Sequence, residues 1–226
     1  MLPRMNLHDD LSRLTLEDFR RKVAGQQPTP AGVAIAAVSA GLALALVAKV
    51  LAVSGRHDKH AENAAVMGPL TTAAQTGSQR VSQLAADDVA AFEAYLAARR
   101  LPHTSGSERQ RREQAISSAV RRAIELPLSA AQEAAAGLQL CKQVCAFVPP
   151  ALTADLGVAA ALLASALRAF LLCAESNVSQ LAPETSLRER VATETERHAS
   201  AFQVADTVLE HVKTAAQTTA KPGNEP

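Results

Sequence analysis

Aromatic residues are scarce in this chain. They make up 3% of its 226 residues, with no Trp and a single Tyr. The hydrophobic fraction is nevertheless 48%, so Ala, Leu and Val must build most of the core. No window shows the alternating β-branched pattern of a strand. Because small side chains let helices approach closely, the sequence predicts an all-α fold of closely packed helices.

Cysteine is also scarce, and the net charge is close to zero. The three cysteines, Cys141, Cys145 and Cys173, lie within apolar helical patterns, which fits a reducing cytosol and a cytoplasmic protein. Cys141 and Cys145 are one helical turn apart, but no His or Cys cluster completes a ligand set, so we expect no metal. The 23 Lys and Arg balance 22 Asp and Glu. This argues against a protein that covers nucleic acid or an anionic membrane.

The longest apolar run follows two prolines, in PTPAGVAIAAVSAGLALALVAKVLAV at 28–53. Residues 31–48 are long enough to cross a membrane, which is the alternative interpretation. However, alanine predominates, Lys49 interrupts the run and no Trp or Tyr flanks it. A charged segment precedes the run, unlike a signal peptide. We therefore expect a buried helix of a soluble protein and no membrane span.

Capping residues and prolines predict the other boundaries. We expect one helical domain over 14–217, a partly disordered segment over 1–13 and a disordered tail over 218–226. Two Ala/Leu-rich helices, over 28–53 and 155–181, should be buried at the centre of an orthogonal or antiparallel bundle. The remaining helices should start at Thr15 with Asp18 in its cap, at Pro69, at Ser107, at Pro127 and at Ser186 with Glu189 in its cap.

Asp88 lies in the middle of an apolar seam with alternating three- and four-residue spacing, in the helix predicted over 69–100. A carboxylate at such a position is costly unless it has a partner or a task. Two interpretations stay open. Asp88 either pairs with an Arg or Lys, or caps another helix, or it is a functional carboxylate.

Several segments match a known family in order and spacing. They are LTLEDF at 14–19, PTPAGVAIAA at 28–37, ADDVAAF at 86–92, RRLPHTSGSERQRR at 99–112, AIELPL at 123–128, ADLGVAA at 154–160 and SNV at 176–178. On these segments the chain resembles the cyclodeaminase and cyclohydrolase family of folate enzymes. That family comprises the C-terminal domain of formiminotransferase-cyclodeaminase and the stand-alone methenyltetrahydrofolate cyclohydrolases.

The resemblance implies an all-helical homodimer that binds a tetrahydrofolate derivative between helices without a metal. It implies that Asp88, in the pattern D-x-x-A-F, is catalytic. It implies substrate-binding roles for Asp155 and Asn177, and it makes Gly32 part of the ligand site. For Asp155, stabilisation of a helix N-terminus is the alternative.

Three departures from the family fall near the implied site. Where the family has PTPGGGSVAA, this chain has AGVA at 31–34, so two glycines and a serine hydroxyl are lost. The family's LPK ends here in His103, which replaces a permanent cation with an imidazole. A Gly-Asn that usually precedes the aspartate helix is replaced by VPP at 148–150. These changes point to altered specificity or lost catalysis.

The implied chemistry is addition of water to the methenyl bridge of a folate cation, which a carboxylate at Asp88 would promote. We favour the cyclohydrolase reaction because no formiminotransferase domain precedes the matched segment. Formiminotetrahydrofolate cyclodeaminase is one alternative, and it needs a proton donor, for which His103 or Lys59 is the candidate. A catalytically degenerate dimeric binding protein is the other. The Arg-rich helix from Ser107 and the cluster at 56–60 either bind the folate's glutamate carboxylates or are solvated faces.

Overall fold

Every regular element in the described part of the chain is helical. The computed structural model describes residues 13–57, 61–181 and 185–219. The predicted all-α class is confirmed. In order, the elements are α1 (Leu16–Val23), α2 (Gly32–His57), α3 (Ala61–Arg99), α4 (Gly106–Val144), the 3-10 turn η2 (Pro150–Leu152), α5 (Thr153–Leu181) and α6 (Thr185–Thr219).

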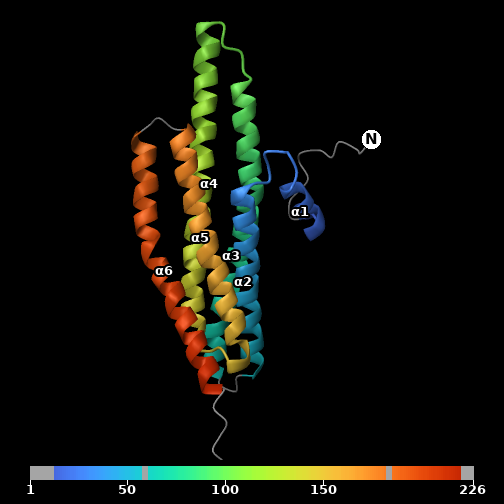
Figure 1. Ribbon diagram of the computed structural model, residues 1–226, viewed down its shortest axis with the longest axis vertical. Helices are drawn as coiled ribbons and strands as arrows, with labels where there is room; N and C mark the ends of the chain where they lie inside the picture. The colour runs from blue at the N-terminus through green and yellow to red at the C-terminus, as the bar shows by residue number, and fades with distance from the viewer. Residues whose placement is uncertain (1–12, 58–60, 182–184, 220–226) are drawn as a thin grey trace, which may run out of the picture.

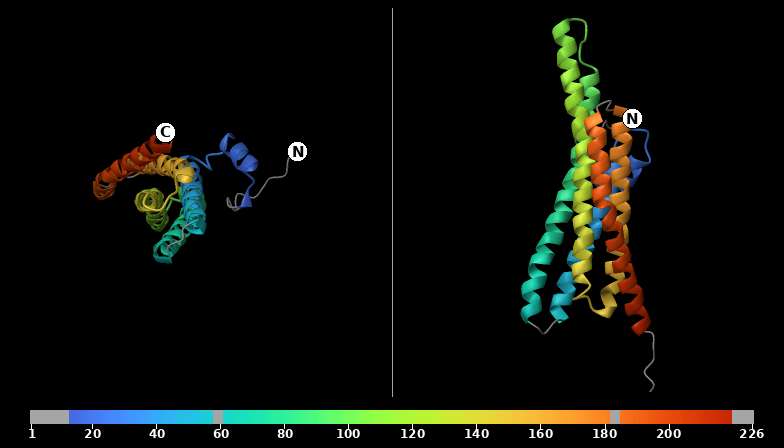
Figure 2. Two further views of the ribbon diagram at one scale, coloured as in Figure 1. Left: turned by 90° about the horizontal axis from the view of Figure 1, so that it is seen from below. Right: turned by 90° about the vertical axis from the view of Figure 1, so that its left-hand side faces the viewer.

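The long helices run along one axis in alternating directions, so the bundle is elongated and not orthogonal (Figure 1). The hairpin of α3 and α4 extends beyond the other helices at the end where α2 begins (Figures 1 and 2). Helix α1 stands apart from the bundle in Figure 1 and in the left-hand view of Figure 2. None of its residues is buried, and among the described residues no α1 side chain packs against the core.

Close approach of small residues holds α2 at the centre of the bundle. Leu44 of α2 reaches between two glycines of its neighbours: a Cβ on Gly137 of α4 would lie 2.9 Å from Leu44 Cδ2, and a Cβ on Gly77 of α3 would lie 3.3 Å from Leu44 Cδ1. On the same side, a Cβ on Gly137 would lie 3.0 Å from Cδ1 of Leu163 in α5. Leu44 and Leu163 are both fully buried, so neither can move aside cheaply. These glycines therefore set the spacing between helices.

The two Ala/Leu-rich helices contribute much of the core, but neither is buried all round. Leu42 of α2 is 59% exposed and Leu172 of α5 is 64% exposed. By length and composition alone, the segments Gly32–Arg56 and Pro150–Ser179 could cross a membrane, yet 61% and 50% of their most apolar windows are buried inside the protein. The expectation of two buried helices is thus corrected: each keeps one exposed apolar face.

Two prolines predicted as helix starts lie inside helices. Helix α3 begins at Ala61, eight positions before Pro69, and α4 runs unbroken through Pro127. A proline removes the N–H that would bond the carbonyl four residues earlier. For Pro69 that carbonyl belongs to Ala65, which is exposed and accessible to water. For Pro127 a side chain supplies the missing bond, as described below.

One of the three predicted helix caps agrees with the structure, and the other two helices begin at different residues. At α1 the Asp18 N–H donates to Thr15 Oγ1 at 3.1 Å, as expected. Helix α4 is capped by Ser105 instead of Ser107, because Glu108 completes a reciprocal capping box with Ser105. Helix α6 begins at Thr185, so Ser186 already lies within it. The ends predicted to be disordered fall almost entirely outside the described residues and stay predictions.

Replacing Gly137 with Ala tests the contact that spaces the helices. The new methyl group would collide with Leu44 and Leu163, whereas nothing lies within 4 Å of a Cβ added to Gly68 of α3. Both substitutions gain the same helix propensity, so it cancels in the comparison. We expect Gly137→Ala to be less stable than Gly68→Ala by about 1–3 kcal/mol in urea unfolding. Equal stabilities would show that the core relaxes freely around Leu44.

Candidate functional site

A cavity of about 260 Å³ lies where the first turn of α2 meets α3, α4 and the C-terminal half of α5. It brings together three of the sequence-predicted site residues, Gly32, Asp88 and Asn177. The other residues that line it are Pro28, Thr29, Ala31, Val33, Phe92, Tyr95, Ala123, Cys173 and Ser176. Segments about 145 positions apart in sequence thus share one small site.

Asp88 carries the ionisable carboxyl group of this cavity. Among the described residues, none hydrogen-bonds to or ion-pairs with that carboxyl group. The nearby cation Arg122 instead lies 3.8 Å from the neighbouring carboxylate, Asp87. Burial raises the pKa of Asp88 from 3.8 to about 6 because the ionised form loses water. The described residues thus do not provide the ion-pair partner or the helix cap that the alternative interpretation of Asp88 requires.

Asn177 has a structural task that the sequence did not reveal. Its Nδ2 donates to the Ala123 carbonyl at 2.9 Å. Ala123 lies four residues before Pro127, so its carbonyl lacks the usual helical partner. Asn177 supplies that partner, which lets α4 continue through the proline and ties α5 to α4. The amide is thereby held in place at the cavity wall.

Gly32 faces a thiol across the cavity. A Cβ at Gly32 would lie 3.2 Å from Cys173 Sγ, so any side chain here would crowd α5. Burial, and then the nearby charge of Asp88, raise the pKa of the Cys173 thiol. The thiol is therefore neutral near pH 7. Cys173 precedes Asn177 by four residues, and this spacing on one helix was the signal that could have identified it.

Two aromatic rings from α3 form another part of the lining. The ring centroids of Phe92 and Tyr95 are 6.5 Å apart. Arg99, one turn further along, donates to Tyr95 Oη at 3.4 Å and lies 5.9 Å from the Tyr95 ring centroid. Arg112 of α4 in turn donates to the Arg99 carbonyl at 3.3 Å. Two cationic side chains, Arg99 and Arg112, therefore lie just outside the cavity, one helical turn beyond Tyr95.

Two of the other predicted site residues, His103 and Asp155, do not line this cavity. His103 is exposed on the connection between α3 and α4. Asp155 lies 3.1 Å from Lys49 Nζ at the start of α5, and the 22 positions that separate it from Asn177 correspond to about 33 Å of helix. Lys59 lies outside the described residues. The structure thus gathers three of the six predicted residues.

The residues that replace the family's glycines and serine lie in different environments. Ala31 and Val33 line the cavity, so their side chains occupy space that glycine would leave open. Ala34 is fully buried in the core and does not line the cavity. Position 34, where the family has a serine, therefore faces the other helices in this chain and not the cavity.

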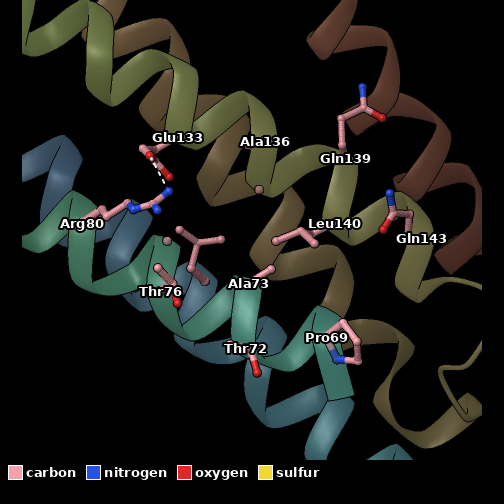
Figure 3. Close-up of a pocket in the computed structure, with 13 residues that line it drawn as sticks. Pro69, Thr72, Ala73, Thr76, Arg80, Glu133, Ala136, Gln139, Leu140 and Gln143 are labelled. Atoms are coloured by element: carbon pink, nitrogen blue, oxygen red, sulfur yellow. Dashed lines mark hydrogen bonds and ion pairs between the residues drawn. The ribbon is translucent and has the colours of Figure 1, made fainter. Parts of the chain in front are cut away.

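A larger hollow of about 830 Å³ lies between α3 and α4 (Figure 3). Its charged groups, Arg80 and Glu133, point toward each other across the hollow and pair at 3.5 Å. The rest of the lining is apolar or neutral, with Thr72, Thr76 and two glutamines at its edges (Figure 3). It contains none of the predicted site residues. The cavity at Asp88 is therefore the better candidate for chemistry, although it is smaller.

Within the described residues, no group of three or more His, Cys, Asp or Glu could hold a metal ion.

Comparison with known proteins gives consistent matches. A family model described as formiminotransferase-cyclodeaminase matches residues 15–197. Formimidoyltransferase-cyclodeaminase of Sus scrofa is 29% identical over 137 residues, which cover 60% of this chain and 25% of that protein. Methenyltetrahydrofolate cyclohydrolase of Methylorubrum extorquens is 30% identical over 115 residues, which cover 51% of this chain and 55% of that protein. The matched regions thus span a quarter and about half of these two relatives.

A solved structure supports the fold. Formiminotetrahydrofolate cyclodeaminase of Thermotoga maritima superposes with a TM-score of 0.76 and 20% identity, covering 93% of this chain and 99% of that one. At this identity the match establishes the arrangement of the helices.

A double-mutant cycle tests the role of Asn177. Asn177→Ala should lower the free energy of unfolding by about 1–3 kcal/mol because it leaves the Ala123 carbonyl without a partner. In a Pro127→Ala background, the backbone N–H of residue 127 can bond that carbonyl, and the cost of Asn177→Ala should fall by at least half. Urea unfolding of the four proteins measures the coupling. An identical cost in both backgrounds would contradict the assigned hydrogen bond.

The unpaired carboxyl group of Asp88 predicts a pH-dependent stability. Its pKa is higher in the folded protein, at about 6, than the ordinary value of 3.8, so folding favours the protonated form. Stability should fall as the pH rises between these values. Asp88→Asn removes this cost and should be more stable than the parent by ~1–2 kcal/mol at pH 8, a figure reduced for partial solvent access. The advantage should vanish near pH 4 in chemical denaturation. Asp87→Asn, at a carboxylate that has a cation beside it, is the control and should show no such gain.

Proposed function

The chain belongs to the formiminotransferase-cyclodeaminase family, and we propose that it is a folate-dependent one-carbon enzyme that hydrolyses methenyltetrahydrofolate to 10-formyltetrahydrofolate. One observation carries this proposal. A carboxyl group without a described partner, Asp88, lines a small cavity together with Gly32 and Asn177. Both a cyclohydrolase and a cyclodeaminase are among the similar proteins, so similarity alone does not distinguish the two reactions. The residues that line the cavity are therefore used to choose between them.

The chemistry of the substrate suits this carboxylate. The methenyl bridge joins N5 and N10 in an amidinium-like cation, and a nearby negative charge favours its binding. A water molecule attacks the bridging carbon, and Asp88 accepts one of its protons. The bond from that carbon to N5 then breaks, the remaining hydroxyl proton is lost as the formyl carbonyl forms, and N5 takes up a proton. The net reaction consumes one water and releases one proton.

The cavity supports the cyclohydrolase reaction over cyclodeamination. Cyclodeamination expels ammonia and therefore needs a group that protonates the leaving nitrogen. Of the two donors predicted for it, His103 is exposed outside the cavity and Lys59 is not described. Among the described residues, the lining contains no Lys, Arg or His. In the hydrolysis, Asp88 can return to N5 the proton that it takes from water, so this reaction needs no second titratable group.

The size of the cavity limits which part of the folate it can enclose. A volume of about 260 Å³ is below the usual range for complete drug-sized ligands, so it suits the fused rings that contain the methenyl bridge. The glutamate end would then lie outside, where Arg99 and Arg112 follow Tyr95 along the hairpin of α3 and α4. Arg56, from the other predicted cluster, lies 24 positions after Gly32 on α2, about 36 Å away, and is too distant.

We also propose that the protein acts as a cytoplasmic homodimer. The exposed apolar residues of α2 and α5 support this, because large side chains such as Leu42 and Leu172 are costly to leave in water.

The decisive assay follows loss of the methenyl chromophore after purified protein is mixed with methenyltetrahydrofolate. We expect acceleration over buffer, and a reduction of about 10²–10⁴-fold in Asp88→Asn, because general bases contribute about that much. The rate should also fall as the pH drops through about 6, where Asp88 becomes protonated. Asp87→Asn, a change at the neighbouring carboxylate, should keep the parent rate.

Three results would redirect the proposal. No acceleration together with no folate binding in calorimetry would favour the degenerate binding protein. An unchanged rate in Asp88→Asn would reject the assigned base. Release of ammonia from formiminotetrahydrofolate, faster than methenyl hydrolysis, would favour the cyclodeaminase.

A further inference from the structure

One side of the cavity at Asp88 comes from a single face of α3, here called the α3 wall. Asp88, Phe92 and Tyr95 follow one another at spacings of four and three residues, so they lie on the same side of the helix. All three line the cavity. Long side chains on a helix lean toward its N-terminus, which brings the Phe92 ring toward Asp88. A carboxyl group and two aromatic rings therefore succeed one another over about 10 Å of the wall.

The two rings keep surface that the core does not use. Both side chains are only partly buried. Among the described residues, Phe92 is not one of those that pack against the hydrophobic core. The ring centroids are 6.5 Å apart and the ring planes are inclined by 39°, so the rings are not stacked face to face. A ligand in the cavity can therefore contact them.

Arg99 shows which kind of group the Tyr95 ring attracts. Its guanidinium carbon lies 5.9 Å from the centre of that ring, within the range of a cation–aromatic contact. A guanidinium is a planar cation with delocalised charge and a weak hydration shell. Arg99 does not line the cavity, so it leaves the cavity side of Tyr95 open.

The charges around the cavity favour a cationic ligand. Asp88 is the ionisable carboxyl group of the lining, and none of the described lining residues is Lys, Arg or His. The face of an aromatic ring carries partial negative charge, which adds to the attraction of the carboxylate. The nearby cation Arg122 is paired with Asp87. A positive ligand would thus be attracted by the carboxylate and the rings, whereas a negative one would be repelled.

We propose that the α3 wall is a recognition site for planar amidinium cations, in which Phe92 and Tyr95 make the cavity select the charged methenyl bridge over neutral folates. The bridge is such a cation, because its charge is shared between N5 and N10. In 5,10-methylenetetrahydrofolate the same three rings carry no charge at the bridge, so the attraction to the wall is lost. The choice of folate as natural ligand rests on the proposed function, whereas the preference for amidinium cations rests on the wall itself.

The role of the rings differs from that of the base. Attack of water removes the positive charge from the bridge, so the attraction to the rings is strongest before the reaction and weakens along it. An interaction of this kind tightens substrate binding without lowering the barrier from the bound state. Loss of a ring should therefore weaken binding and leave kcat equal or slightly higher. By contrast, Asp88→Asn should lower kcat.

A test that needs no folate uses benzamidine and benzamide, which have nearly the same shape but differ in charge. Both are titrated into the full-length protein at pH 8, where Asp88 is ionised, and followed by NMR of the ligand. Benzamidine should bind roughly tenfold more tightly than benzamide. Difluorophenylalanine in place of Phe92 keeps the ring but withdraws electron density from its face. It should weaken benzamidine binding about fivefold and leave benzamide unchanged.

The same replacement at Phe147, which lies outside the cavity, is the matched control and should change neither affinity. Equal affinities for benzamidine and benzamide, or no binding of benzamidine, would overturn the recognition site. An unchanged affinity after fluorination at Phe92 would show that the ring makes only an apolar contact. These readouts involve no hydrolysis, so the inference can fail while methenyltetrahydrofolate is still hydrolysed, and it can succeed when it is not.

A second experiment tests the folate itself. Single-turnover hydrolysis with protein in excess separates the Kd of methenyltetrahydrofolate from the rate of the chemical step. Phe92→Leu should raise this Kd about fivefold, without lowering the rate of the step. The inhibition constant of 5,10-methylenetetrahydrofolate should change by less than about twofold, because that ligand has no charge at the bridge.

Tyr95→Phe, which keeps the ring, should retain the selectivity, and Tyr95→Leu should reduce it. Equal weakening of both folates in Phe92→Leu would contradict selection by charge. A slower chemical step with an unchanged Kd would contradict the assignment of Phe92 to specificity.

Discussion

The close packing of α2 through small side chains is the constraint on which the rest of this structure depends. Ala and Gly positions let three other long helices approach α2, and Leu44 lies against two of its neighbours where glycine leaves room. This arrangement fixes where the first turn of α2 meets α3 and α5. The cavity at Asp88 forms at that meeting point, so the packing that stabilises the bundle also determines the position of its candidate site.

A second constraint links α4 to the same place. Pro127 would ordinarily weaken or end a helix, and the sequence alone indicated a boundary there. The helix continues because Asn177, distant in sequence, donates to the carbonyl that the proline leaves free. Whether a proline ends a helix therefore depended on a tertiary contact, which local patterns do not encode. The same contact shows that a residue implied as substrate-binding has a structural task, which does not prevent its carbonyl oxygen from also contacting a ligand.

The seam on α3 predicted Asp88 correctly as an inward-facing carboxyl group because a helical period depends only on spacing along one element. Residues on separate helices were harder to group. The resemblance implied substrate binding for both Asp155 and Asn177, which lie on the same helix. The length of α5 nevertheless puts them about 33 Å apart. Cys173 was recognised only as part of an apolar helical pattern, because such a pattern does not show which of its positions border a cavity. The fold class could be predicted from composition. Which residues line the cavity could not, because that depends on where the helices pack against one another.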